Sequence, residues 1–149
     1  MAMEFTERQK EAISADGSVI VYAAAGSGKT AVLTERVVRR LLDEKNPIDA
    51  DKFLIVTFTN AAAAEMRTRI SSLLNEKAGD NPSEHAQHQL SLISAAPICT
   101  IDSFCINIVR ENFELAGVSP DFKMASGSVT TPISEGIIRT MVADSFSHL

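Results

Sequence analysis

A glycine-rich turn near the N-terminus carries the residues best suited to chemistry. Gly26-Ser27-Gly28-Lys29-Thr30 stands between a short apolar run and an amphipathic stretch, which predicts a strand, a turn and a helix in that order. Gly26 and Gly28 free the backbone to aim N–H groups at phosphate oxygens, and the following helix adds its positive N-terminal end. Lys29 would then meet the β- and γ-phosphates, and the Thr30 hydroxyl would bind Mg²⁺. The turn is therefore predicted to bind a nucleoside triphosphate with Mg²⁺, with Lys29 and Thr30 as its catalytic residues.

The predicted phosphate-binding loop covers residues 23–30. Its members are Ala23, Ala24, Ala25, Gly26, Ser27, Gly28, Lys29 and Thr30. Ala23 stands where the pattern GxxxxGKT has its first glycine, and alanine makes a positive φ costly there, so we expect a less tight entry to the loop. Upstream, Gln9 carries an amide that donates and accepts at once, as pairing with the edge of adenine requires. A solvated helix is the alternative interpretation of Gln9.

Two further polar clusters come directly after apolar runs. The first consists of Thr57, Phe58, Thr59 and Asn60, and the second of Thr100 and Ser103. Ligands of open α/β sheets bind at the carboxyl ends of the strands. Hydroxyl and amide groups there can hold phosphates in an acidic protein, and Phe58 can stack on a base. Taken alone, the first cluster is better explained as a helix cap with a core phenylalanine, and the second as a helix cap.

The periodicity of apolar residues predicts the elements that hold these clusters. Predicted strands cover 18–22, 53–58 and 97–101, and predicted helices follow each of them, with another at 84–94 and a last one at 133–146 after a linker. Residues 53–58 are apolar on both alternations, which indicates a strand covered on both faces. Three strand–helix units in series predict an α/β fold, with a parallel sheet and helices on both faces.

Composition limits the class of protein. The chain has 149 residues, of which 45% are hydrophobic and 22% charged, as expected of a globular protein with about one domain. The net charge of −5 gives no global positive field, so a polyanion must be held locally. No apolar run approaches the ~18 residues of a membrane span, and the N-terminus lacks the pattern of a secretory signal. We therefore expect a soluble, cytoplasmic protein with no membrane partner.

The motifs together indicate a family. Gln9, AAAGSGKT, FLIVTFTNAAAAEMRTRI and TIDSFC occur in the order and spacing of the Q motif, motifs I and Ia and the next DNA-contacting motif of superfamily 1 helicases. Over roughly residues 4–122 the chain resembles the UvrD/Rep/RecB group, and most of all the helicase/nuclease subunits of bacterial recombination complexes. The resemblance implies a RecA-like P-loop NTPase fold. Residues 1–122 would form part of the first motor domain, and 123–149 a linker and the start of an inserted helical subdomain.

The resemblance also implies a function. The intact protein would be an ATP-dependent DNA helicase, with exonuclease activity elsewhere in its chain, that acts in double-strand-break repair and recombination. Lys29 and Thr30 would bind ATP and Mg²⁺, Gln9 would bind adenine, and residues 57–60 with 100–103 would contact the single strand. Single- or double-stranded DNA and a second helicase/nuclease subunit would be its partners.

Several features of the chain depart from that pattern. Ala31 stands where many relatives have an arginine against the base, and Asp102 where many have a histidine. Because a carboxylate repels phosphate, Asp102 is predicted to cap a helix instead. The Walker B carboxylates, the second motor domain and the nuclease carboxylates do not occur in the chain, so we expect a truncated piece that binds nucleotide weakly and does not turn it over.

Two other functions are compatible with the same residues. A small P-loop kinase would use the GSGKT turn for phosphoryl transfer to a metabolite. A non-enzymatic interaction module on a P-loop scaffold would use the apolar stripe predicted at 133–146.

Overall fold

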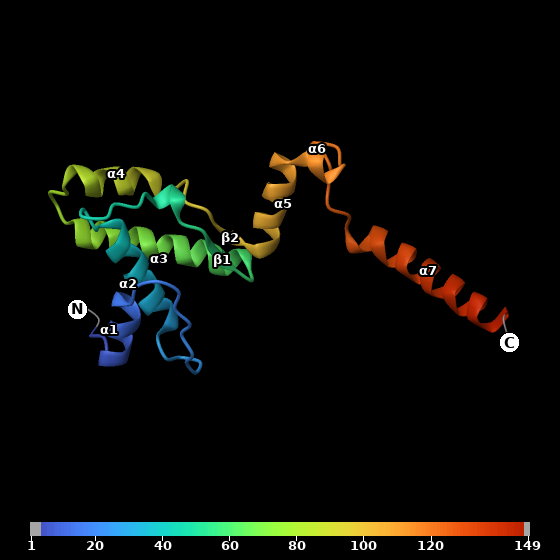
Figure 1. The fold of residues 1–149 in the computed structure, drawn as a ribbon, viewed down its shortest axis with the longest axis horizontal. Helices are drawn as coiled ribbons and strands as arrows, with labels where there is room; N and C mark the ends of the chain where they lie inside the picture. Colours follow the sequence, from blue (N-terminus) through green and yellow to red (C-terminus); the bar gives the residue numbers. More distant parts are fainter. Residues whose placement is uncertain (1–3, 148–149) are drawn as a thin grey trace. The chain divides into compact units, whose positions relative to one another are not determined.

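The computed structural model describes residues 4–147, and residues 1–3 and 148–149 lie outside it (Figure 1). The chain forms two compact units, Met1–Asn107 and Ile108–Leu149. The boundary between them falls inside the helix α5 (Ile101–Glu111).

The first unit contains helices, a short 3-10 helix and two strands. In chain order they are α1 (Glu7–Ser14), α2 (Lys29–Leu41), η1 (Ala50–Lys52), β1 (Ile55–Thr57), α3 (Asn60–Ala78), α4 (Glu84–Leu92), β2 (Ile98–Thr100) and the start of α5. Side-chain caps begin several of the helices. Thr6 and Gln9 form a reciprocal capping box on α1, while Thr59 and Ser83 cap α3 and α4. Such caps supply acceptors for N–H groups that have no partner within the helix.

The strands β1 and β2 form a parallel sheet. Ile55 pairs with Ile98, and Thr57 pairs with Thr100. Two of the three predicted strands are thus confirmed in a shorter form, and the unit is α/β. The predicted strand at 18–22 is wrong for this structure, in which that segment has no strand pairing. An apolar, β-branched run becomes a strand only when a neighbour takes up its backbone hydrogen bonds, and within residues 4–147 only β1 and β2 pair.

The core lies where α2 and α3 pack together and α3 covers the sheet. Leu41, Ile70 and Leu74 are fully buried there, and the spacing of Ile70 and Leu74 places both on one face of α3. The opposite face of β1 is open, because Val56 is 46% exposed. The prediction that both faces of 53–58 are covered is therefore wrong for the described residues.

The start of α5 differs from the prediction. Thr100 precedes the helix and its Oγ1 accepts a hydrogen bond from the Ser103 N–H at 3.2 Å, so Thr100 is the cap and Asp102 lies inside the first turn. A threonine at the N-cap reaches the third helical N–H, whereas a side chain at the second helical position cannot. The predicted single helix to residue 116 is interrupted at Asn112. It continues as α6 (Phe113–Ala116), which ends at Gly117 with φ +65°.

The second unit contains the end of α5, α6 and α7 (Gly127–Ser147). Helix α7 begins six residues before the predicted start at 133 and includes Pro132. Pro132 lacks the N–H that would bond to Ser128, and the helix continues past the gap. Its apolar residues Ile133, Ile137 and Met141 are all more than half exposed. Within residues 4–147, no helix combines the length and the apolar character that a membrane crossing requires.

Candidate nucleotide site and strand-end cluster

The glycine-rich turn has the backbone that its sequence predicts. Gly26 and Gly28 have φ of +76° and +81°, and within residues 4–147 every positive φ belongs to a glycine. Ala23 therefore has a negative φ, as the steric argument for alanine requires. Gly28 is the N-cap of α2 and offers no side-chain acceptor to the first turn. Lys29 and Thr30 are the first two residues of the helix, and both are exposed.

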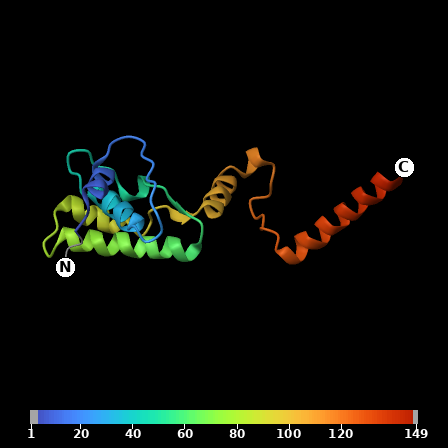
Figure 2. The same ribbon diagram turned by 90° about the horizontal axis from the view of Figure 1, so that it is seen from below.

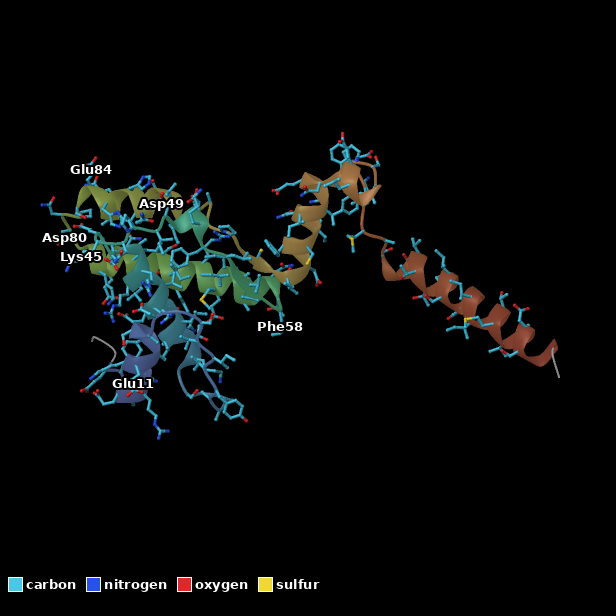
Figure 3. The ribbon with its side chains drawn as sticks, viewed as in Figure 1. Glu11, Lys45, Asp49, Phe58, Asp80 and Glu84 are labelled. Carbon is cyan, nitrogen blue, oxygen red and sulfur yellow. The ribbon has the colours of Figure 1, made fainter. Side chains whose placement is uncertain are left out.

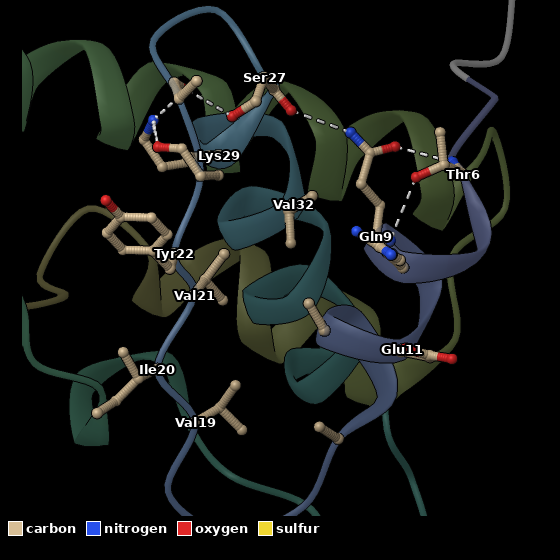
Figure 4. Close-up of a pocket in the computed structure, with 15 residues that line it drawn as sticks. Thr6, Gln9, Glu11, Val19, Ile20, Val21, Tyr22, Ser27, Lys29 and Val32 are labelled. Atoms are coloured by element: carbon tan, nitrogen blue, oxygen red, sulfur yellow. Dashed lines mark hydrogen bonds between the residues drawn. The ribbon is translucent and has the colours of Figure 1, made fainter.

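The ammonium of Lys29 lies over the loop itself. Its Nζ donates to the carbonyl oxygens of Ala23 and Ala24 at 2.9 and 2.6 Å, and Ser27 Oγ donates to the same Ala24 oxygen at 2.7 Å (Figure 4). These bonds keep a positive charge at the mouth of the turn. The local structure thus puts a cation, positive-φ glycines and a helix N-terminus in one place, which is an arrangement that suits an anion.

Gln9 reaches the same turn from α1. Its Oε1 accepts from the Thr6 N–H at 2.8 Å, and its Nε2 donates to the Ser27 carbonyl at 3.2 Å (Figure 4). A Cβ built on Gly28 would lie 3.1 Å from that nitrogen, so the glycine allows the close approach. The Gln9 amide is thus engaged at both ends, although α1 is mostly exposed, as the alternative of a solvated helix expects.

A pocket of about 700 Å³ opens between α1 and the segment that leads into the loop (Figure 4). Gln9, Ser27 and Lys29 line it, together with residues 19–24. Ile20 and Tyr22 are almost fully exposed there. The segment predicted as a strand therefore forms one wall of this pocket.

The two polar clusters lie side by side at the carboxyl end of the sheet. Thr57 and Thr100 are register partners on neighbouring strands. Thr100 Oγ1 lies 2.8 Å from Ser103 Oγ, and Thr59 Oγ1 accepts from the Ala62 N–H at 3.1 Å. The hydroxyls of Thr59 and Thr100 thus cap helices, as the alternative interpretation of these clusters expects.

Phe58 is not part of the core. It is 96% exposed and points away from the sheet (Figure 3). The interpretation of Phe58 as a core residue is therefore wrong, and an aromatic ring stands free beside the paired threonines. Asn60 follows as the first residue of α3.

Arg67 is a residue of this region that the sequence reasoning missed. Its guanidinium donates to four carbonyl oxygens, those of Ile93, Ser94, Ala96 and Ile98, at 3.0–3.2 Å. The bonds fasten the segment after α4, up to the first residue of β2, to α3. Its position one turn after the buried Ala63 was the available signal, because an arginine on the apolar face of a helix must find acceptors.

A comparison with known protein families covers the same motifs. Residues 5–147 match the model of the UvrD/REP helicase N-terminal domain. The chain belongs to this family. The match includes the loop, the Gln9 segment and both strand ends, so the UvrD/REP family resemblance seen in the motifs is confirmed.

Several curated relatives bear the name of an ATP-dependent helicase/nuclease subunit. One from Acetivibrio thermocellus is 50% identical over 124 residues, 82% of this chain. One from Thermoanaerobacter sp. is 48% identical over 132 residues, 87% of this chain, and one from Bacillus cereus strain AH820 is 41% identical over 145 residues, 96% of this chain. These alignments cover only 10–12% of the relatives. The UvrD/REP chain thus spans about a tenth of the length of the curated relatives it matches.

Proposed function

We propose that the chain is the ATP-binding N-terminal part of an ATP-dependent DNA helicase/nuclease subunit. The observation that carries the proposal is the convergence of Gln9, the positive-φ glycines and Lys29 on one turn at the head of α2. The family membership and the names of the relatives support it. In the intact protein we propose a motor with a RecA-like fold that acts in double-strand-break repair and recombination. Its partner would be a second helicase/nuclease subunit, which together with it would form an AddA–AddB-like complex.

The residues present fit ATP with Mg²⁺. The turn offers a cation and backbone N–H groups for the phosphates, and the Gln9 amide stands at its edge with donor and acceptor atoms suited to adenine. Mg²⁺ commonly keeps several waters and takes few protein ligands beside phosphate oxygens, so the exposed Thr30 hydroxyl suffices as the protein's contribution. Bound ATP would supply the phosphoanhydride bond whose hydrolysis drives the motor.

The strand-end cluster is the proposed contact for single-stranded DNA. The exposed ring of Phe58 can stack on a base. The neighbouring Thr57, Asn60 and Ser103 add neutral groups for sugar and phosphate oxygens. Thr100 is only 7% exposed, so its contribution is to hold Ser103 through the 2.8 Å contact between their hydroxyls. Neutral donors suit a chain of net charge −5, because they hold phosphates without requiring a basic surface.

Replacing Lys29 with alanine tests the nucleotide site. Loss of a charged hydrogen bond to phosphate should weaken binding of a fluorescent ATP analogue with Mg²⁺ by about tenfold or more. Titration by fluorescence anisotropy measures it, with phosphate release followed in the same samples. Lys52→Ala is the matched control, because it removes the same charge from an exposed position in η1.

The outcomes separate the candidate functions. Equal affinities of the Lys29→Ala and Lys52→Ala chains would contradict the proposed site. DNA-independent turnover with a small-molecule acceptor would favour a P-loop kinase, and absence of any nucleotide binding would favour an interaction module.

Replacing Gly28 with alanine is expected to weaken ATP binding about tenfold. A left-handed φ costs an L-residue roughly 1–2 kcal/mol, and the new Cβ would press on Gln9 Nε2, which lies 3.1 Å from its position. The same titration measures the effect. Gly79→Ala is the control, because Gly79 has φ +69° with nothing within 4 Å, so it should lower stability and leave ATP affinity unchanged. Unchanged affinity in both variants would refute the role of the close contact.

A further inference from the structure

Helix α1 is held at its C-terminal end by an arginine of α2. Arg36 Nη1 donates to the carbonyl oxygens of Ala12 and Ile13 at 2.8 and 3.2 Å. These carbonyls belong to the last turn of α1, where oxygens lack partners within the helix. A cation at that end also interacts favourably with the helix dipole. The contact is part-buried, and Ile13 is 7% exposed.

The position of α1 depends on such contacts. It has eight residues, and helices this short are marginal in water without packing against a neighbour. Both ribbon views show α1, in blue, against α2 (Figures 1 and 2). At the N-terminal end of α1, the contact with the phosphate-binding loop is the bond from Gln9 Nε2 to Ser27. Arg36 and Gln9 thus fasten opposite ends of α1 to the α2 segment.

We propose that Arg36 is a positioning residue for recognition of the nucleotide base. It follows Lys29 by seven residues in the same helix, a rise of about 10 Å, so it does not reach a triphosphate held at the loop. By fixing α1, it sets where the Gln9 amide stands relative to the glycine turn. The phosphate contacts are local to the loop and α2, whereas the base contact depends on α1. The inference rests on the proposed binding of ATP.

The test distinguishes recognition of the base from recognition of the phosphates. Dissociation constants are measured for ATP, GTP and inorganic tripolyphosphate, each with Mg²⁺, in the 149-residue chain and its Arg36→Ala, Arg36→Lys and Gln9→Ala variants. We expect Arg36→Ala to weaken ATP binding about fivefold, which corresponds to the loss of roughly one hydrogen bond. It should also narrow the preference for ATP over GTP, as Gln9→Ala does. Tripolyphosphate affinity should stay unchanged, and Arg36→Lys, which keeps a donor and the charge, should restore part of the preference.

Arg40→Ala is the matched control. Arg40 lies one turn further along α2 and pairs with Asp16 at 2.6 Å, but the Asp16 side chain is 89% exposed, and exposed pairs contribute little. This variant should keep the parent preference. Thermal unfolding of each variant shows whether it is folded at the temperature of the titration.

Three results would overturn the inference. In the first, Arg36→Ala keeps the parent ratio of the dissociation constants for ATP and GTP. In the second, it weakens the binding of tripolyphosphate as much as the binding of ATP. In the third, the parent chain itself binds ATP and GTP with equal affinity. Lys29→Ala distinguishes these from failure of the proposed function: if it leaves the affinities for all three ligands unchanged, the nucleotide site itself is wrong. If Lys29→Ala weakens the binding of all three ligands while Arg36→Ala gives one of these overturning results, only the positioning role of Arg36 fails.

Discussion

Replacing Arg67 with alanine should lower the free energy of unfolding by about 3 kcal/mol, because four carbonyl oxygens lose a charged donor together. Ile93 and Ile98 are both buried, so water replaces the guanidinium poorly beside them. Denaturant unfolding followed by circular dichroism measures the change. A loss of this size would also lower the melting temperature by roughly 12–24 °C for a unit of about 100 residues.

Arg69→Ala is the control for Arg67. Arg69 lies two residues further along α3, is about half exposed and pairs with Glu65 one turn before it. Such a pair contributes about 0.5 kcal/mol or less. Equal destabilisation by the two variants would show that the carbonyl contacts of Arg67 add nothing beyond a surface charge.

The second large effect is expected at Ile70. This side chain has no exposed surface and lies in the core cluster with Leu41, Leu74 and Ile55. Ile70→Ala truncates the side chain to a methyl group and leaves a cavity between α3 and the sheet, which costs about 2–5 kcal/mol. The midpoint of urea unfolding should fall accordingly, with the slope unchanged.

Ile48→Ala provides the comparison for Ile70. Ile48 is 39% exposed, so the same truncation leaves less of a cavity and should cost about 1 kcal/mol or less. A cost at Ile70 no larger than at Ile48 would contradict the assignment of the core to the α3–sheet contact.

The contacts of Arg67 and Ile70 matter for the proposed function because both residues lie in α3, the helix that begins in the strand-end cluster. The helix begins at Asn60 in the strand-end cluster, and Arg67 and Ile70 lie about two to three turns later. Arg67 fastens the segment before β2, and Ile70 packs beneath the sheet. Thr57 and Thr100 stay neighbours because these contacts set the strands side by side.

Local chemistry made the conformation of the glycine-rich turn predictable from the sequence. The GSGKT pattern requires glycines of positive φ followed by a helix, and Gly26, Gly28 and α2 follow it. The caps of Thr59 and Thr100 are equally local, because a hydroxyl reaches an N–H three residues along the chain. The prediction that Asp102 is the cap is wrong because Thr100 and Asp102 both have the chemistry of a cap, and only the backbone geometry distinguishes them.

Long-range pairing decided the rest. Residues 18–22 have the composition of a strand, yet composition cannot supply the neighbour that a strand requires, and the structure leaves Ile20 and Tyr22 exposed along a pocket. The contacts of Arg36 with α1 and of Arg67 with residues 93–98 join residues 23 to 31 positions apart. No periodic pattern of residues in the sequence predicts these contacts.

The sequence by itself therefore determined the glycine-rich turn, because its backbone conformation depends on consecutive residues, and it determined the UvrD/REP family through short motifs of the same kind. Only the tertiary structure decided which strands pair and which arginines hold the site together, because those interactions depend on segments that meet through folding.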